Sequence, residues 1–500
     1  MKKIKWLSLL IAVSLVGSLG FVSCHHDSDE EEEEEVIQNE EEDTTVTVSF
    51  NIANAKLLAS SNSSLTSRYA RAAGDNYSSL LKVLTDGSVI PAMEVEGEFD
   101  EGETNGKIKG IIKSPKTEHV YLWNNYPVYA KGWNQKVFDS LVCIRSDGTY
   151  KNILTQKTQF RDEDILLMDD ASWITFDDSG NAYFMARDPG FYDVFIYKYD
   201  PTTDSRTLLM SEISEYEGKK CEYKMENIMV SKDGKYVYVG LRYDSCAAND
   251  LSNFDNHVEY SVKVIPINNL NDAVEIRALN LSWVYNTYDE KLYVSCKGLA
   301  GEDYPEGSSY ARTYCYSKDG KSRGNILVEE YFSYLFTSKA GVWGKVEPYV
   351  GEPTKFKNIL ATDNTASATI DYGDYFEKTE RWYIDTGDYV YLCFQGQHYD
   401  LPDYQGNEAA FNNDYLNWVH TNYVYQIWRL NPTNSSLEKV FVNSPVKDYI
   451  YIDSWTTDGK ELYYSGYNKT TPYNGKVDLS TFEHRQVSAD KSLANFAIMN

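Results

Sequence analysis

Short runs in which apolar and polar residues alternate cover most of this chain, and Asp, Asn, Gly and Ser separate them. The clearest case is NIMVSKDGKYVYVG, residues 227–240, where two apolar runs flank a turn. Asp233-Gly234 supplies the positive φ values of a two-residue hairpin turn, and the residues beyond it alternate between two faces. We find no long stretch with the 3.6-residue period of an amphipathic helix. The pattern predicts an all-β protein.

This hairpin pattern recurs six more times. The copies are IIKSPKTEHVYLW (111–123), ITFDDSGNAYFMA (174–186), VYNTYDEKLYVSC (284–296), YLFTSKAGVWGKV (334–346), RWYIDTGDYVYLCF (381–394) and IDSWTTDGKELYYSG (452–466). A second hairpin follows most copies, most clearly at 194–209 and 425–442, so each unit is expected to hold four strands. A lone hairpin is barely stable in water, and the repeated units must therefore pack on one another.

Four antiparallel strands repeated about seven times resemble a β-propeller, whose blades pack radially and leave only short sheet edges. The resemblance places the propeller at 78–500, where a hairpin at 78–95 supplies a strand that closes the ring. Six or eight blades, or an array of β-sandwiches, are the alternatives. The chain has neither a Trp-Asp repeat nor a sialidase Asp-box, so the repeat form identifies no specific family.

The first residues have the features of an export signal. Lys2, Lys3 and Lys5 precede a short apolar run, and small residues lead to Cys24. This resembles a bacterial lipoprotein signal at 1–23, which implies lipidation of Cys24; an ordinary cleaved signal peptide is the alternative. Residues 24–77 are expected to form an acidic disordered tether and a Ser/Asn-rich linker, with one strand at 44–52. The expected location is the outer membrane, at the cell surface or on the periplasmic face.

The net charge limits the partners. The formal charge is −27, and residues 27–43 alone hold 12 of the 75 acidic residues. Because phosphate binding relies on Lys and Arg, nucleic acid is excluded as a partner. Neutral sugars, cations and proteins remain possible partners. The membrane is a further expected partner, through the lipid on Cys24.

The longest connections are expected on one face of the ring. They join the second and third strands of their units, at 124–137, 243–257, 298–308 and 396–421. Loops on a rigid scaffold often carry binding sites, and their aromatic side chains suit sugars or a protein partner. The alternative is that these rings pack the loops onto the blades. The candidate binding residues are Tyr126, Trp133, Tyr243, Tyr304, Tyr399, Tyr404, Tyr415 and Trp418.

Cysteine and histidine spacing predicts little chemistry. Cys221 with Cys246, and Cys296 with Cys315, are candidate disulfides, with buried thiols as the alternative. The histidines have no short ligand spacing, and no nucleophile elbow or phosphate loop is present. We therefore predict no metal site, no cofactor and no catalytic residue.

The sequence thus predicts a lipid-anchored extracytoplasmic propeller that binds a glycan or an envelope protein through one elaborated face. A polysaccharide hydrolase or lyase on the same scaffold is the alternative, because a fold does not fix a function. A structural envelope protein is a third possibility.

Overall fold

A computed structural model describes the protein at residues 46–61, 79–97, 108–124, 127–129, 136–154, 166–168, 173–187, 193–212, 219–247, 258–299, 311–346, 354–361, 367–370, 375–377, 382–398, 418, 423–440, 451–468, 471–489 and 491–499. The chain forms two compact units, Met1–Asp43 and Thr44–Asn500, and the described residues all belong to the second. This unit contains every hydrophobic cluster of the described chain, so it has the core that an independently folding domain needs. No helix in its described residues is long and apolar enough to cross a bilayer.

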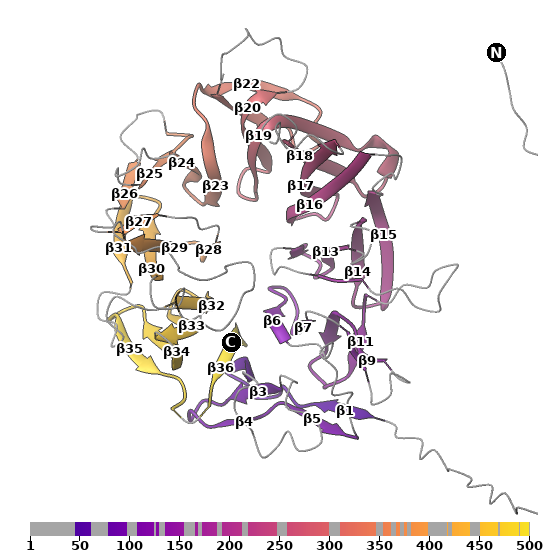
Figure 1. Ribbon diagram of the computed structural model, residues 1–500, viewed down its shortest axis with the longest axis vertical. Helices are drawn as coiled ribbons and strands as arrows, with labels where there is room; N and C mark the ends of the chain where they lie inside the picture. The colour runs from indigo at the N-terminus through magenta and orange to yellow at the C-terminus, as the bar shows by residue number, and fades with distance from the viewer. Residues whose placement is uncertain are drawn as a thin grey trace, which may run out of the picture. The chain divides into compact units, whose positions relative to one another are not determined.

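The described strands form eight antiparallel blades around a central axis, which confirms the predicted all-β propeller (Figure 1). The first three blades in chain order are β6 (Ile108–Lys113), β7 (Val120–Asn124), β10 (Leu141–Ile144), β11 (Tyr150–Asn152); β12 (Ile174–Phe176), β13 (Ala182–Arg187), β14 (Val194–Asp200), β15 (Ser205–Glu212); and β16 (Lys219–Val230), β17 (Tyr236–Ala247), β18 (Val258–Pro266), β19 (Val274–Asn286).

The next four blades complete most of the ring. They are β19, β20 (Lys291–Leu299), β21 (Ala311–Tyr316), β22 (Arg323–Val328); β23 (Phe332–Ser338), β24 (Gly341–Val346), β25 (Thr354–Asn358), β26 (Ser367–Ile370); β27 (Tyr375–Glu377) and β28 (Trp382–Asp385) with β29 (Val390–His398), β30 (Tyr423–Asn431), β31 (Ser436–Lys439); and β32 (Tyr451–Thr457), β33 (Glu461–Asn468), β34 (Thr471–Asp478), β35 (Glu483–Gln486). Strand β19 pairs with both β18 and β20, so two blades share one seven-stranded sheet. All seven predicted hairpins are the first two strands of a blade.

The eighth blade closes the ring, and both ends of the chain build it. Its inner strand is β36 (Leu493–Ile498), followed by β2 (Leu57–Ser61), β3 (Leu80–Val83) and β4 (Val89–Pro91). The prediction that the hairpin at 78–95 contributes to closure is confirmed by β3 and β4. The prediction that 57–76 is only a linker is wrong at 57–61, because Leu57 and Leu58 are buried and pair with β36.

A small sheet lies beside this closing blade. Strand β1 (Thr47–Phe50), inside the predicted range 44–52, pairs with β5 (Met93–Glu96). Phe50 packs edge-on against Tyr150 of the next blade, with ring centroids 5.4 Å apart. A second small pair joins β8 (Val128–Tyr129) and β9 (Lys136–Phe138). The segment at 46–50 therefore belongs to the folded body and not to the tether.

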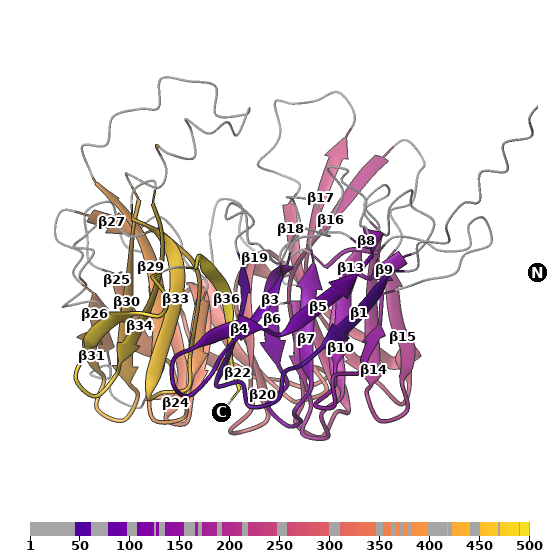
Figure 2. The ribbon, with the colours of Figure 1, turned by 90° about the horizontal axis from the view of Figure 1, so that it is seen from below.

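The turns are longer than the sequence suggests. Between β16 and β17 only Gly234 has a positive φ, 63°, and its N–H donates to the carbonyl of Ser231. The Asp-Gly pair is thus not a two-residue turn, and its glycine ends a longer one. Figure 2 shows that the turns joining first to second and third to fourth strands lie along one face of the ring. The connections at 248–257, 300–310 and 399–422 therefore leave from the opposite face, as predicted.

Candidate binding site

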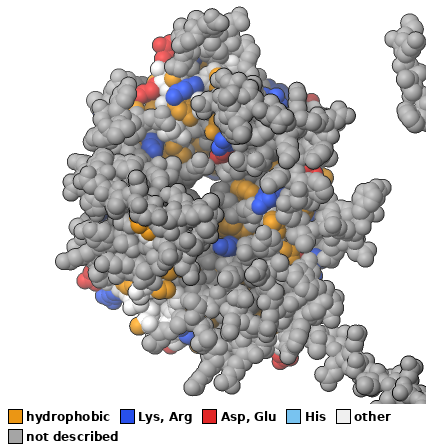
Figure 3. All heavy atoms as spheres, in the orientation of Figure 1, with side chains coloured by type: hydrophobic (Ala, Val, Ile, Leu, Met, Phe, Trp, Pro, Cys, Tyr) orange, Lys and Arg blue, Asp and Glu red, His pale blue; other side chains and the backbone are white. Residues whose placement is uncertain are grey.

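A cavity of about 1360 Å³ lies along the axis of the ring. Residues of the innermost strand of each blade line it, from β6, β12, β16, β19, β23, β28, β32 and β36. The space-filling view shows an opening at the centre of the face from which the longer connections leave (Figure 3). Because all eight blades contribute, no single repeat contains the site.

A register shift recurs in five of these inner strands; in β36 it lies opposite Leu58 and Ser60 of β2, and the other four share one pattern. The register shifts by one residue against the second strand between Ile108 and Gly110, Met225 and Asn227, Phe332 and Tyr334, and Ile452 and Ser454. A β-bulge of this kind redirects the extra side chain. The four bulged residues, Lys109, Glu226, Ser333 and Asp453, all line the cavity.

These bulges lie at similar heights along the axis. Lys109, Glu226 and Ser333 each stand five residues before the serine that opens the following turn, and Asp453 stands four before Thr457. Lys109, Ser333 and Asp453 are near the start of their strands, hence toward the face of the longer connections, whereas Glu226 is the eighth residue of the 12-residue strand β16. The hydroxyl oxygen of Ser333 is buried and has no hydrogen-bond partner among the described residues. This level of the cavity is therefore polar.

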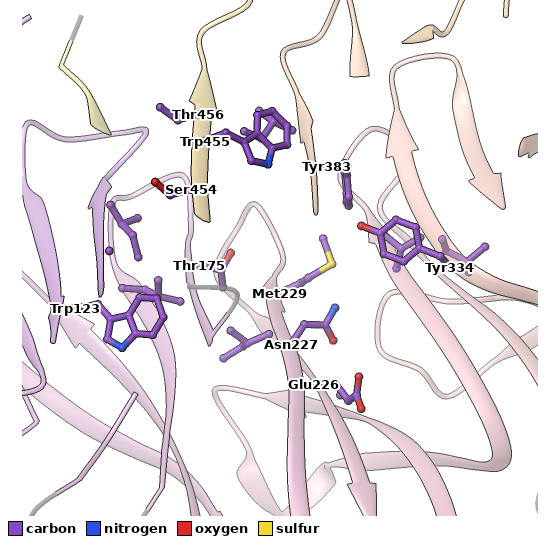
Figure 4. A pocket seen from close by; sticks show the side chains of 18 of the residues that line it. Trp123, Thr175, Glu226, Asn227, Met229, Tyr334, Tyr383, Ser454, Trp455 and Thr456 are labelled. Atoms are coloured by element: carbon purple, nitrogen blue, oxygen red, sulfur yellow. The ribbon is translucent and has the colours of Figure 1, made fainter. Parts of the chain in front are cut away.

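Aromatic rings form much of the remaining wall (Figure 4). Tyr334 meets Tyr383 edge-on, with centroids 6.1 Å apart at 75°. Trp123 covers Gly110, where a Cβ would lie 2.7 Å from the indole Cε3, so only glycine permits this packing. The indole N–H of Trp123 donates to the carbonyl of Met168, which fixes the ring. The aromatic residues of the wall are Trp123, Tyr260, Trp283, Tyr331, Tyr334, Tyr383, Trp455 and Phe496.

Amide groups stand among these rings. A Cβ on Gly240 would lie 2.6 Å from Oδ1 of Asn227 and 2.7 Å from Nε1 of Trp283, so both polar groups converge on a space that glycine leaves open. Asn280 and Asn495 also line the cavity. Amides offer both donors and acceptors, which suits ligands that carry hydroxyl groups.

Asp453 is the most perturbed acid of the cavity wall. Asp453 lines the cavity, and the residue is more than a third exposed. Separation from bulk water raises its pKa to about 7, and the nearby ammonium of Lys109 opposes that rise. Asp453 is therefore partly protonated at neutral pH. Burial also raises the pKa of Tyr383, which keeps its hydroxyl neutral.

The candidate loop residues mostly fall outside the described chain. Tyr126, Trp133, Tyr304, Tyr399, Tyr404 and Tyr415 lie outside it, Tyr243 lies in β17 opposite Tyr223, and Trp418 is half-buried. Neither Tyr243 nor Trp418 is among the described residues that line the cavity. The analysis of loops missed the inner strands. A usable signal was present at the start of the strand Tyr451–Thr457, where Asp, Ser and Trp interrupt the apolar alternation.

The cysteine predictions need one correction. Cys296 and Cys315 are not joined by a disulfide, because Cys296 pairs in register with Arg312 and Cys315 with Tyr293, which separates them along the ladder. The register places Cys221 opposite Ser245 and Cys246 opposite Lys220, one position from a direct pair. The side chains of these two cysteines lie outside the described residues.

Other chemistry is limited in the part of the chain that the structure describes. It contains no group of three His, Cys, Asp or Glu side chains able to hold a metal ion. The described residues that line the cavity include no histidine and no cysteine. Asp453 and Glu226 are the carboxyl groups at the bulge level, and no carboxylate contributes to the pKa of Asp453.

Comparison with known proteins shows the fold and no closer relationship. No family model and no curated protein matches the chain. An acylaminoacyl peptidase structure is 13% identical with a TM-score of 0.43, covering 77% of this chain and 52% of its own, so this chain spans about half of that enzyme. The β-propeller domain of the trilobed protease from Pyrococcus furiosus is 12% identical with a TM-score of 0.42. The match covers 76% of this chain and 98% of that domain. An oligogalacturonate lyase from Vibrio parahaemolyticus is 9% identical with a TM-score of 0.42. The match covers 76% of this chain and 93% of the lyase. The arrangement of the described strands in blades of mostly four strands makes this chain a β-propeller.

Proposed function

We propose that this protein is a lipid-anchored, extracytoplasmic binding protein that holds a glycan in the central cavity of its propeller. The observation that carries the proposal is the cavity wall, in which eight aromatic residues lie among amides and hydroxyls around a volume of about 1360 Å³. Ordinary small-molecule pockets measure roughly 300–1000 Å³, so this one has room for a ligand of several rings.

The composition of the wall suits sugars. Indole and phenol rings present flat apolar faces, on which the C–H faces of a pyranose can stack, and each also has a polar edge. The amides of Asn227, Asn280 and Asn495 supply donors and acceptors for hydroxyl groups. The longer connections on the same face, with their candidate aromatic residues, would extend the contact surface beyond the cavity.

The membrane anchor is part of the same proposal. Cys24 would carry acyl chains, each buried CH₂ contributing roughly 0.8 kcal/mol to membrane binding. The acidic run after it would hold the propeller away from the bilayer, because like charges keep a chain extended. A surface or periplasmic position would place the cavity where extracellular glycans pass.

A glycan array probed with the unit 44–500 tests this function. We expect binding to a defined set of glycans, and replacing Trp455, a cavity aromatic, by alanine should weaken it at least about fivefold. Tyr288 is the matched control, since it is an aromatic residue 46% exposed on the turn face. Binding that is equally weakened by Tyr288→Ala, or unchanged by Trp455→Ala, would exclude the cavity as the site.

Catalysis on a glycan is a second candidate function, which the same assay can test. Asp453 is half-protonated near neutral pH and could donate a proton to a glycosidic oxygen or take one from a sugar carbon. Retaining and inverting hydrolases need a second carboxyl about 5–9.5 Å away. Within the described chain no carboxylate couples to Asp453, which favours binding without turnover. Product analysis on each bound glycan, with Asp453→Asn as the test variant, distinguishes the two functions. Cleavage would favour catalysis over binding alone.

A further inference from the structure

Two bulged residues of opposite charge flank the strand that closes the ring. Lys109 is in β6 and Asp453 in β32, and the inner strand between them is β36. Asn495 of β36 is hydrogen-bonded to both β32 and β6. Its backbone N–H donates to Oγ of Ser454 over 3.0 Å, and its side-chain amide donates to the carbonyl of Ile108 over 3.0 Å.

The conformation of Asn495 explains why this arrangement is rigid. Its φ is 52°, a left-handed value that asparagine tolerates better than most residues. The same amide also donates to Oγ of Ser60 over 2.9 Å. Asn495 thus holds the residues adjoining both bulges, and the positions of Lys109 and Asp453 are fixed relative to one another.

Neither charged group is paired with another described side chain. Within the described residues Lys109 and Asp453 form no ion pair and no hydrogen bond, with each other or with any other side chain. The ammonium is still close enough to act on the carboxyl electrostatically. Lys109 and Asp453 are both exposed within the cavity, so both side chains are accessible to a ligand that enters it.

The described wall of the cavity is less acidic than the chain as a whole. In the whole chain acidic residues outnumber basic ones by 75 to 48. The described lining instead has three lysines, Lys109, Lys113 and Lys460, beside Glu226, Asp453 and Asp458. Basic side chains are visible beside the central opening in Figure 3. Lys113 is engaged by the carbonyl of Met499 at 2.8 Å, so Lys109 is the ammonium available at the bulge level.

We propose that Lys109 and Asp453 form a subsite for the carboxylate of an acidic sugar, with Asn495 as the residue that positions them. This inference rests on the proposed glycan-binding function and names its ligand class. The ammonium of Lys109 binds one carboxylate oxygen as a charge-assisted donor. The protonated carboxyl of Asp453 donates to the other oxygen. Trp455, two residues from Asp453, and Trp123 are the aromatic surfaces for the sugar ring.

The subsite has a defined pH dependence. Lys109 is the charged group that faces Asp453 from β6, while Tyr451 on β32 and Tyr467 on β33 are neutral phenols near it, and the described part of β36 has no titratable side chain. Protonated Asp453 donates to the ligand, whereas the ionised form repels it. Affinity for an acidic sugar should therefore fall as pH rises above about 7, by up to tenfold per pH unit.

Calorimetric titration with matched oligosaccharides tests the subsite. The probes are oligomers of galacturonate and galactose, and of glucuronate and glucose, which differ in the group on C5, titrated into the unit 44–500 at pH 6.0 and 8.5. We expect at least one acidic oligomer to bind about tenfold more tightly than its neutral partner at pH 6.0. Lys109→Met should abolish that preference, and Asp453→Asn should keep binding but remove the pH dependence, because an amide donates at both pH values.

The control variant and the outcomes separate the two proposals. Lys151→Met removes an exposed lysine from the outer strand β11 and should change nothing. Lys109→Arg should retain the preference, which distinguishes lost charge from a folding defect. Equal binding of acidic and neutral oligomers, or a preference that survives Lys109→Met, overturns the subsite and leaves the glycan-binding function standing. No binding of any glycan, on this panel or on the array, overturns both.

Discussion

The substitution Asp453→Asn should stabilise the propeller more at alkaline pH than at acidic pH. The pKa of Asp453 is raised from 3.8 to about 7 in the folded chain, so the folded state holds a proton that the unfolded state has released. Stability therefore falls as pH rises between about 4 and 7 and stays low above that window. Asparagine cannot ionise, and the variant should lack this loss.

The magnitude follows from the shift and the surroundings of the side chain. A shift of about three units corresponds to at most roughly 4 kcal/mol, at about 1.36 kcal/mol per unit. Asp453 is more than a third exposed to cavity water, and screening by that water reduces the effect to about 1–2 kcal/mol. The variant should therefore gain about 1–2 kcal/mol over the wild type at pH 8.5, with a smaller gain at pH 5.

Urea unfolding of both chains between pH 5 and 8.5 measures this gap. Asp388→Asn is the control, because Asp388 is exposed on the turn face and pairs with Lys339, which lowers its pKa. Asp388 stays ionised across the range, so its variant should show a constant difference. A gap for Asp453→Asn that is the same at both ends of the range, or a loss of stability at pH 8.5, would refute the account of a carboxyl confined in the cavity.

Three further predictions concern closure, packing and thiols. Phe496 of β36 is 5% exposed and contacts Tyr463 at a centroid distance of 6.0 Å, so Phe496→Ala should cost about 3–5 kcal/mol in urea unfolding; a cost under about 1 kcal/mol would show that closure depends little on β36. Gly110→Ala should displace Trp123, costing about 1–3 kcal/mol and shifting tryptophan fluorescence, and unchanged fluorescence would contradict the packing described. Buried Cys143, Cys296 and Cys393 should react with maleimide only after unfolding, as peptide mass mapping would show; labelling of the native chain would count against their burial.

Local turns explain why the sequence revealed so much of the ring. Each of the seven hairpins joins strands that are neighbours in the chain, so a turn such as that around Gly234 and the alternation beside it are visible together. The second hairpins, such as β14 with β15, follow the same rule. Strand order within a blade then decides which connections share a face. The fold class, the repeat of four antiparallel strands and the face with the longer connections were therefore predictable from local sequence.

The eighth blade was not predictable in this way. Its two inner strands, β36 and β2, come from opposite ends of the chain, so no turn connects them and no hairpin pattern marks them. The segment Leu57–Ser61 is short and followed by Ser and Asn, which resembles a linker until its partner is known. The count of seven was short by the one blade that has no first hairpin.

The cavity was decided by the tertiary structure alone. Lys109, Glu226, Ser333 and Asp453 are far apart in sequence, and each lies in a different strand. Ring closure brings them to one level, and the bulges turn their side chains inward. The chain by itself determined its strands, because alternation and turns act between neighbours. Which polar residues meet depended on eight blades closing a circle, because that proximity exists only after the ends of the chain have paired.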